Sequence, residues 1–321
     1  MIQRLQIENF RGLRQFDITS FKRVNLIAGA NNVGKSALLE CIFFALHNEL
    51  EKAADWFPRM VRPAPQDEDA ARNFWEWTFS DHDTTKPVHI RATGEGFDHD
   101  RWISAKTQPA GPGQIEVMKF DNFAIRTGDE SNAIPPGVTV FTNSGAPNPV
   151  REAIDYNRVV LRRGGEERLL ALLRKMEPRL SKIRALQVAR NPYLFADIGF
   201  PELIPVTQMG QGFSRLLGIY AEMVVADKGV VLIDEVENGI HHAVLRDVWQ
   251  GLTALAQEED VQIFATTHSW ECIRAAHLHF AETLDYDFAL HRLDRTKEGV
   301  KLVTYDREML ESALQAELEV R

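Results

Sequence analysis

The residues with the most specific chemistry form an eight-residue segment that combines glycines with a lysine and a hydroxyl. Residues 29–36 read Gly-Ala-Asn-Asn-Val-Gly-Lys-Ser and lie between an apolar strand and an apolar helix. Triphosphate oxygens need backbone N–H donors at a helix N-terminus, and glycines let the chain present those donors closely. The lysine adds charge at the β- and γ-phosphates, and the serine hydroxyl is a ligand for Mg²⁺. We therefore predict a nucleotide site made by Gly29, Asn31, Asn32, Val33, Gly34, Lys35, Ser36 and Ala37.

A pair of carboxylates directly follows a second apolar strand. Residues 230–233 are entirely aliphatic, and Asp234 and Glu235 come next. Burying an unpaired carboxylate beside apolar residues costs free energy. A pair of carboxylates at this position therefore indicates a binding or catalytic role. At the carboxyl end of a parallel strand, Asp234 can hold Mg²⁺ through water opposite Ser36, and Glu235 can take a proton from the attacking water. Either carboxylate alone also fits a helix N-cap.

A histidine follows a third short strand. Residues 264–269 read Phe-Ala-Thr-Thr-His-Ser, so His268 is expected at the same edge of the sheet. A neutral imidazole there can hydrogen-bond the γ-phosphate or the attacking water, although a single histidine is more often structural. No Asn-Lys-X-Asp guanine motif occurs in the sequence, which favours ATP over GTP. We predict ATP hydrolysis with Lys35, Glu235 and His268 as catalytic residues, and Mg²⁺ at Ser36 and Asp234.

Strands and helices alternate around these motifs. Strands that lack polar alternation and are separated by helices indicate a mostly parallel sheet covered on both faces. We predict an α/β fold of the P-loop NTPase type, with helices flanking that sheet and an additional antiparallel β-rich portion. Strands are expected at residues 24–28, 230–233 and 262–266, and helices at 36–46, 166–176, 213–226 and 243–256.

Changes in pattern along the chain predict its organisation. Between residues 48 and 149, short strand candidates alternate with turn-rich pieces, and no internal repeat is visible. We predict a single domain over residues 1–321. Its nucleotide-binding core is expected from residues 1–50 and 200–321, a β-rich insertion from 51–150, and a helical, signature-side subdomain from 151–199.

Composition excludes a disordered or collagen-like chain. The chain has 321 residues, a net charge of −9, 44% hydrophobic residues and 26% charged residues, as in ordinary globular proteins. No apolar run is long enough to span a membrane, and the polar N-terminus lacks a secretory signal, so a cytoplasmic location is expected. The two cysteines, Cys41 and Cys272, lie in apolar helical contexts and are expected to be buried.

The acidic average hides a basic segment. Between Arg151 and Arg190 there are eleven Lys/Arg residues against five Asp/Glu residues, a local charge of +6. A basic face can bind the phosphate backbone of duplex DNA even on an acidic protein. The alternative is a solvated helical surface on which these cations pair with Glu166, Glu167 and Glu177, or with an acidic partner protein.

The three motifs, in this order, resemble the ABC-type ATPase head shared by the SMC, RecF and Rad50 proteins. The chain is more closely similar to the AAA-15/AAA-21-type ATPases of the overcoming-lysogenisation-defect (OLD) group. Leu5–Gly12 resembles their first strand, Ile233–His242 resembles their acidic motif and D-loop, and Met209–Leu217 stands where the ABC signature is expected. The likeness covers nearly the whole chain and is weakest between residues 48 and 149.

The resemblance implies a homodimer that closes head to tail around two ATP molecules, so that the signature of one subunit completes the site of the other. Gly210 and Gly212 would then contact the γ-phosphate held by the partner. Arg11 would belong to the nucleotide site, although Arg11 and Gly12 also fit turn chemistry. The signature lacks the Ser-Gly-Gly core of transporters, and His241 stands where a transporter D-loop has aspartate.

Features that are missing from the sequence narrow the function further. No sustained heptads separate the phosphate loop from the signature, which argues against a coiled-coil tether, and the residues after His268 are too few for a Toprim nuclease. The resemblance therefore implies a role in prokaryotic defence against phage with a separately encoded effector, a nuclease or toxin, and no membrane partner. The alternatives are a RecF/SMC-like DNA-repair ATPase, a transporter ATPase, and a regulatory module that binds ATP without hydrolysing it.

Overall fold

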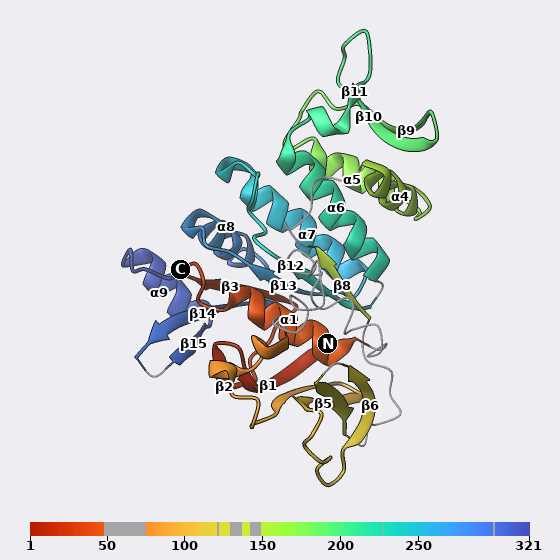
Figure 1. Ribbon diagram of the computed structural model, residues 1–321. Coiled ribbons are helices and arrows are strands. Elements are labelled where there is room, and N and C mark those ends of the chain that lie inside the picture. The colour runs from red at the N-terminus through yellow and green to blue at the C-terminus, as the bar shows by residue number, and fades with distance from the viewer. Residues whose placement is uncertain (48–74, 121, 129–136, 142–148, 227, 298) are drawn as a thin grey trace.

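The computed structural model describes residues 1–47, 75–120, 122–128, 137–141, 149–226, 228–297 and 299–321. Two six-stranded sheets and one three-stranded sheet are formed within these ranges (Figure 1). One large sheet is mostly parallel and the other is antiparallel, so the predicted α/β architecture is confirmed.

The core sheet has the strand order β15-β14-β3-β13-β12-β8, and each neighbouring pair is parallel except β14 with β15. All residues of β3, β12 and β13 are buried, as their almost unbroken apolar sequences require of strands covered on both faces. The strands are β3 (Val24–Gly29), β8 (Val138–Phe141), β12 (Val230–Ile233), β13 (Gln262–Thr266), β14 (Phe288–Thr296) and β15 (Gly299–Tyr305).

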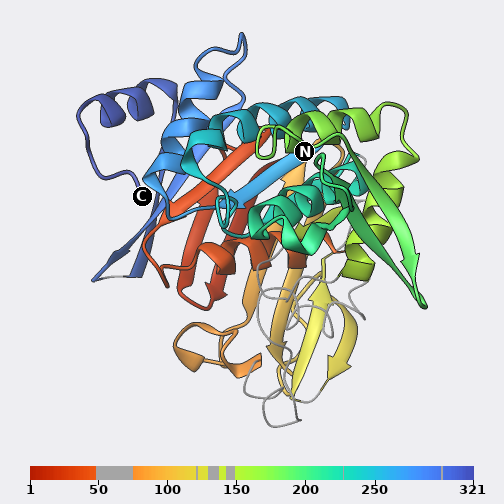
Figure 2. The same ribbon diagram turned by 90° about the horizontal axis from the view of Figure 1, so that it is seen from above.

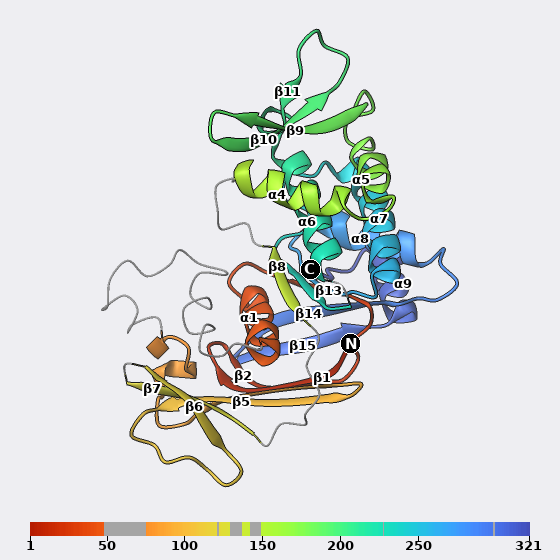
Figure 3. The same cartoon turned by 90° about the vertical axis from the view of Figure 1, so that its right-hand side faces the viewer.

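Helices cover both faces of the core sheet, and each face has its own apolar core. On one face, α1 (Lys35–Leu46) packs in the same cluster as Ile27, Leu232 and Phe264, and Figure 3 shows it between the core sheet and the antiparallel sheet. On the other face, Leu26 and Val231 belong to a cluster that includes residues of four helices beside this sheet. These are α6 (Gln211–Ala226), α7 (Leu245–Glu258), α8 (Trp270–Phe280) and α9 (Arg307–Gln315).

The antiparallel sheet has the order β2-β1-β4-β5-β7-β6 and turns an apolar face towards α1. Along β4 and β5, buried residues largely alternate with more exposed ones, as expected for a sheet with one solvated face, whereas all of β7 is buried. A short 3₁₀ turn, Ser80–His82, precedes β4. The strands are β1 (Ile2–Phe10), β2 (Leu13–Ile18), β4 (Val88–Gly94), β5 (Phe97–Ala105), β6 (Ile115–Phe120) and β7 (Phe123–Thr127).

A third part contains helices and a hairpin. Its elements are α4 (Pro149–Val160), α5 (Gly165–Leu173), β9 (Lys182–Val188), β10 (Asn191–Asp197) and β11 (Ile204–Pro205), followed by a 3₁₀ turn at Val206–Gln208. The β9–β10 hairpin projects from the rest of the chain in two perpendicular views (Figures 1 and 2).

The structure differs from the predicted organisation in three places. The segment 151–199 was expected to be helical, yet residues 182–197 form this hairpin, and α5 ends at Leu173 rather than at residue 176. Strands β1 and β2, expected in the nucleotide-binding core, pair within the antiparallel sheet, whereas β8, expected in the insertion, pairs with β12 of the core. Residues 51–74 of that insertion lie outside the described residues.

The two cysteines are buried, as their apolar sequence contexts predict. Burial raises the pKa of the Cys41 and Cys272 thiols, so they behave as small apolar side chains. Among the described helices, none is both long and apolar enough to cross a membrane.

Candidate functional site

The segment between β3 and α1 forms a compact loop whose backbone requires small residues. Gly29 has a φ of +146°, Gly34 has a φ of +114°, and Asn32 has a left-handed φ of +60°. A Cβ at Gly29 would lie 2.6 Å from the carbonyl oxygen of Leu293 on β14, so packing also excludes any side chain there. The loop leads into the N-terminus of α1, where N–H groups have no partner within the helix. This is the backbone form in which helix N-termini bind phosphate.

The ammonium group of Lys35 lies inside this loop. Its Nζ donates to the carbonyl oxygens of Gly29 at 2.8 Å and Ala30 at 3.0 Å. Burial lowers the pKa of Lys35, and the carboxylates of Asp234 and Glu235 oppose that shift. The lysine is therefore a buried cation whose present partners are neutral carbonyls, which an anion in the loop would replace favourably.

Ser36 and Asp234 meet at the carboxyl edge of the core sheet. Ser36 Oγ donates to Asp234 Oδ1 at 3.2 Å, and Thr266 Oγ1 donates to the same oxygen at 2.7 Å. Thr266 Oγ1 in turn accepts the backbone N–H of Glu235 at 2.7 Å. Residues from α1 and from the ends of β12 and β13 thus converge, because the carboxyl ends of parallel strands share one edge. The sequence pointed to Ser36, Asp234 and Glu235 but not to Thr266.

His268 lies just past the end of β13, where a buried carboxylate holds it. Glu237 Oε1 accepts the backbone N–H of His268 at 3.0 Å and lies 3.3 Å from its Nδ1. The His268 side chain is 51% exposed, whereas that of Glu237 is only 9% exposed. The imidazole is therefore oriented by a fixed carboxylate and remains open to solvent on its other side.

Arg11 forms a turn and a partly buried ion pair. Its φ of +48° turns the chain between β1 and β2. Its Nη1 lies 2.8 Å from Oε2 of Glu40, which is 1% exposed on α1. The side chain therefore links the antiparallel sheet to the helix that follows the phosphate loop. Turn chemistry is present, and a direct role in nucleotide binding stays a prediction.

The expected signature occupies the start of α6. Gly210 is exposed with a φ of +95° and has open space where a Cβ would stand. A Cβ on Gly212 would lie 2.0 Å from the carbonyl oxygen of Gly239, so the two backbones touch. The signature end of α6 is therefore packed directly on the segment that follows Asp234 and Glu235.

Comparisons with known proteins agree on the type of fold. Residues 4–100 match a family model described as an AAA domain. Residues 181–273 match one described as "AAA domain, putative AbiEii toxin, Type IV TA system". An "ATP/GTP phosphatase" of Helicobacter pylori is 22% identical over 324 aligned residues, which cover 85% of this chain and 86% of the relative.

Solved structures cover almost the entire chain. An SMC head bound to the C-winged helix domain of ScpA superposes with a TM-score of 0.60 at 12% identity, over 98% of this chain and 99% of that one. The chain therefore has the fold of an ABC-type ATPase head. The SMC head with an extended coiled coil, bound to a ScpA domain from Pyrococcus furiosus, gives a TM-score of 0.57 at 12% identity, over 98% of both chains. The predicted likeness to the SMC class of ATPase heads is confirmed at the level of the fold, and the two matching AAA-domain models agree with the predicted ATPase activity.

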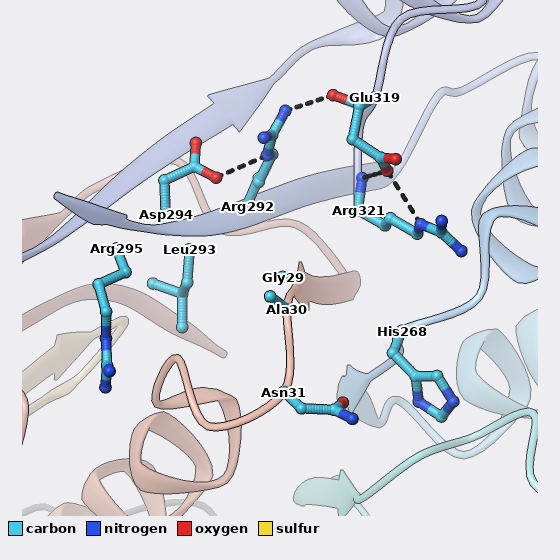
Figure 4. Close-up of a pocket in the computed structure, with 10 residues that line it drawn as sticks. All are labelled: Gly29, Ala30, Asn31, His268, Arg292, Leu293, Asp294, Arg295, Glu319 and Arg321. Carbon is cyan, nitrogen blue, oxygen red and sulfur yellow. Dashed lines mark hydrogen bonds and ion pairs between the residues drawn. The ribbon is translucent and has the colours of Figure 1, made fainter.

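A cavity of about 460 Å³ opens beside the phosphate loop (Figure 4). The loop residues Gly29 and Asn31 line it together with His268. Cationic side chains from β14 and the last described residue also line it, which the sequence motifs did not indicate. Arg292 donates to the Asp294 carboxylate and to the Glu319 carbonyl, Arg321 donates to the Glu319 carboxylate, and Arg295 donates to the Asn32 carbonyl.

Several residues that hold the site in position were not indicated by the sequence motifs. Thr266 lies within the quoted histidine segment, and a polar residue at the end of an apolar strand was the available signal. Glu237 lies two residues after Glu235 and was visible as a third carboxylate. Arg215 of α6 donates to the carbonyl oxygens of Asp234 and Glu235. No feature of the sequence around Arg215 pointed to this contact.

Proposed function

We propose that this ATPase is a two-state switch that binds ATP at residues 29–37, dimerises around it, and opens after hydrolysis. The observation that supports this most is the hydrogen-bonded cluster of Ser36, Asp234, Thr266 and Glu235, which brings the phosphate loop and the acidic motif to one edge of the sheet. His268 lies past the next strand at the same edge. The cluster contains the groups that a hydrolytic site requires.

The polar groups at this edge fit a magnesium ion. Ser36 Oγ and Asp234 Oδ1 are hard oxygen donors 3.2 Å apart, which is the donor type that Mg²⁺ prefers. We assign Mg²⁺ to Ser36 directly and to Asp234 through water. When bound, Mg²⁺ neutralises charge on the β- and γ-phosphates.

Each remaining residue has a proposed role in hydrolysis. Lys35 exchanges its carbonyl partners for phosphate oxygens and stabilises their charge. Glu235 accepts a proton from the water that attacks the γ-phosphorus. His268, oriented by Glu237, hydrogen-bonds the γ-phosphate or that water. Backbone N–H groups of the loop hold the phosphates in place.

We further propose that each site is completed by Gly210 and Gly212 of a second copy. Both glycines lie at the N-terminal end of α6, where unpaired N–H groups and the helix dipole favour an anion. ATP would thus close two heads, and hydrolysis would release them.

Turnover per protomer is expected to rise with protein concentration and then level off, because a monomer lacks the second signature. Steady-state phosphate release at saturating ATP, measured alongside light scattering over a wide range of protein concentration, checks this. Constant turnover per protomer at concentrations where the protein is monomeric would contradict the dimeric site.

For the biological role, we propose prokaryotic anti-phage defence with a separately encoded effector. The support is the model matched by residues 181–273, whose description includes a putative AbiEii toxin. A neighbouring nuclease or toxin gene would favour this role, and a neighbouring group of DNA-repair genes would favour the RecF-like alternative.

The basic segment gives partial support to that alternative. Arg151 and Arg158 pair with Asp155, and Arg179 pairs with Glu177. Other cations in the segment pair with Glu258 and Asp247 on α7, while Glu166 accepts from the Tyr156 hydroxyl. Much of the local charge is therefore neutralised, and Arg162 donates to the Val224 carbonyl. Among the described residues of this segment, Arg163, Arg174, Arg184 and Arg190 are exposed and form no ion pair, and Arg174 donates instead to the Leu180 and Ser181 carbonyls.

Reversing Arg163, Arg184 and Arg190 to glutamate is expected to weaken duplex DNA binding. Each lost phosphate contact lowers the salt slope of log K by about 0.9. Fluorescence anisotropy at several salt concentrations measures both quantities. The matched control reverses Lys22, Lys228 and Lys297, which changes the net charge equally elsewhere. Equal effects of the two triple variants would assign any DNA binding to overall charge rather than to this segment.

A further inference from the structure

A buried arginine on the signature helix is bonded to the backbone of the acidic motif. Arg215 lies in the second turn of α6 and is 7% exposed. Its Nη2 donates to the carbonyl oxygen of Asp234 and, at 2.7 Å, to that of Glu235. One guanidinium nitrogen thus holds two successive carbonyl groups.

The backbone of Glu235 adopts a conformation that needs such support. Its φ is +51°, in the left-handed region that a residue with a Cβ rarely enters. Its N–H donates to Thr266 Oγ1, and its carbonyl also accepts the N–H of Asn238 at 3.0 Å. Strained residues of this kind persist only where their surroundings fix them. Arg215 fixes Glu235 at its carbonyl oxygen, and Thr266 fixes it at its N–H.

The surroundings of Arg215 keep it charged and in place. Burial lowers the pKa of Arg215 to about 10, and the carboxylates of Glu237, Asp234 and Glu235 oppose that shift. The guanidinium is therefore protonated at neutral pH. A cation surrounded by these carboxylates is costly to remove without disturbing them.

The signature end of α6 contacts the same segment at a second point. Gly212 packs against the carbonyl of Gly239 so closely that a side chain would not fit. The acidic motif and the segment after it therefore touch α6 at both Gly212 and Arg215. A displacement of the α6 N-terminus must move the carbonyl groups of Asp234 and Glu235, or break these contacts.

We propose that Arg215 is a positioning residue that fixes the proton acceptor Glu235 and links its position to the signature of the same subunit. This inference rests on the proposed function, in which Glu235 is the general base. Because the signature contacts ATP held by the partner, Arg215 would make Glu235 in one site respond to closure around the other site.

A double-mutant cycle tests whether Arg215 acts through Glu235. The variants are Arg215→Lys, Glu235→Gln and the double variant, with kcat and KM from phosphate release and Kd for ATP from calorimetry. Lysine keeps the charge but lacks the planar fork. We expect Arg215→Lys to lower kcat by about 10- to 100-fold, since small misplacements of reacting groups have costs of that size. The Kd for ATP should stay nearly unchanged.

Comparing Arg215→Lys in the wild-type protein and in the Glu235→Gln protein separates a positioning role from a general structural effect. In the Glu235→Gln protein, Arg215→Lys should cause almost no further loss of turnover, because the group that it positions is already inactive. The matched control is Arg126→Lys. Arg126 is also buried and donates to a carbonyl, that of Gln108, but it lies in the antiparallel sheet. This control should lower the unfolding temperature comparably while kcat is retained.

The outcomes distinguish this proposal from the proposed function. Unchanged kcat in Arg215→Lys, or an equal loss in both backgrounds, overturns the positioning role while leaving Glu235 as the base. Full turnover in Glu235→Gln alone contradicts the proposed function itself and removes the basis of the positioning role. If Arg215→Lys does not fold, Arg215→Gln provides the same comparison, because its amide can donate to one of the two carbonyl groups.

Discussion

Replacement of Lys35 with alanine is expected to abolish ATP binding. The ammonium group is buried, and among the described residues its hydrogen-bond partners are the carbonyl oxygens of Gly29 and Ala30. A triphosphate that enters the loop brings charge that backbone N–H groups alone do not offset, and charge-assisted hydrogen bonds are about twice as strong as neutral ones. Isothermal titration calorimetry with ATP and Mg²⁺ measures the effect directly.

The matched control for this variant is Lys228→Ala, which removes an exposed lysine that precedes β12. Thermal unfolding of both variants without nucleotide shows whether the fold is intact, since Lys35→Ala also removes two hydrogen bonds within the loop. Near-normal ATP affinity in a folded Lys35→Ala protein would refute the assignment of residues 29–37 as the phosphate site.

The parts of the site that could be predicted are those whose chemistry is local in sequence. Residues 29–36 contain the glycines, the lysine and the hydroxyl of a phosphate loop in one continuous segment. Residues 230–235 contain both an apolar strand and the carboxylates at its end. Because the carboxyl ends of parallel strands meet at one edge, the strand pattern also predicted that these groups are neighbours.

The contacts that hold the site in position could not be predicted, because the two partners of each contact are distant in sequence. Arg215 donates to a carbonyl 19 residues away, and Glu237 accepts an N–H 31 residues away. Arg11 pairs with Glu40 across two different layers of the fold. A pattern of residue types indicates that a side chain is buried, but it does not specify which backbone group that side chain contacts.

The sheet to which a strand belongs was difficult to predict for the same reason. Strand β8 is short and apolar, and no local feature assigns it to β12 of the core rather than to the antiparallel sheet. The hairpin of β9 and β10 follows two helices, and the charges of β9 suggested that the helical pattern continued. In the structure, Ile183 of β9 and Leu194 and Ala196 of β10 bury one face, which is the alternation of strands.

Glu235→Gln is expected to bind ATP but to hydrolyse it about 10²–10⁴-fold more slowly, the usual cost of losing a general base. Glutamine keeps the shape of the side chain but cannot accept the proton of the attacking water. Two hydrogen bonds that fix the backbone of this residue run from its N–H to Thr266 Oγ1 and from Arg215 to its carbonyl oxygen. These two bonds do not depend on the carboxylate, so the backbone of residue 235 should keep its position.

The stalled protein also tests the dimer. With ATP bound and turnover blocked, the closed form should accumulate, so light scattering with ATP should report twice the mass found without it. The control is Glu308→Gln, which makes the same change of charge at an exposed position on α9 and should keep wild-type turnover. Wild-type turnover in Glu235→Gln would remove Glu235 as the base. A slow variant that stays monomeric with ATP would retain the base but contradict the head-to-tail closure, because a trapped ATP complex is the state in which two signatures should be engaged.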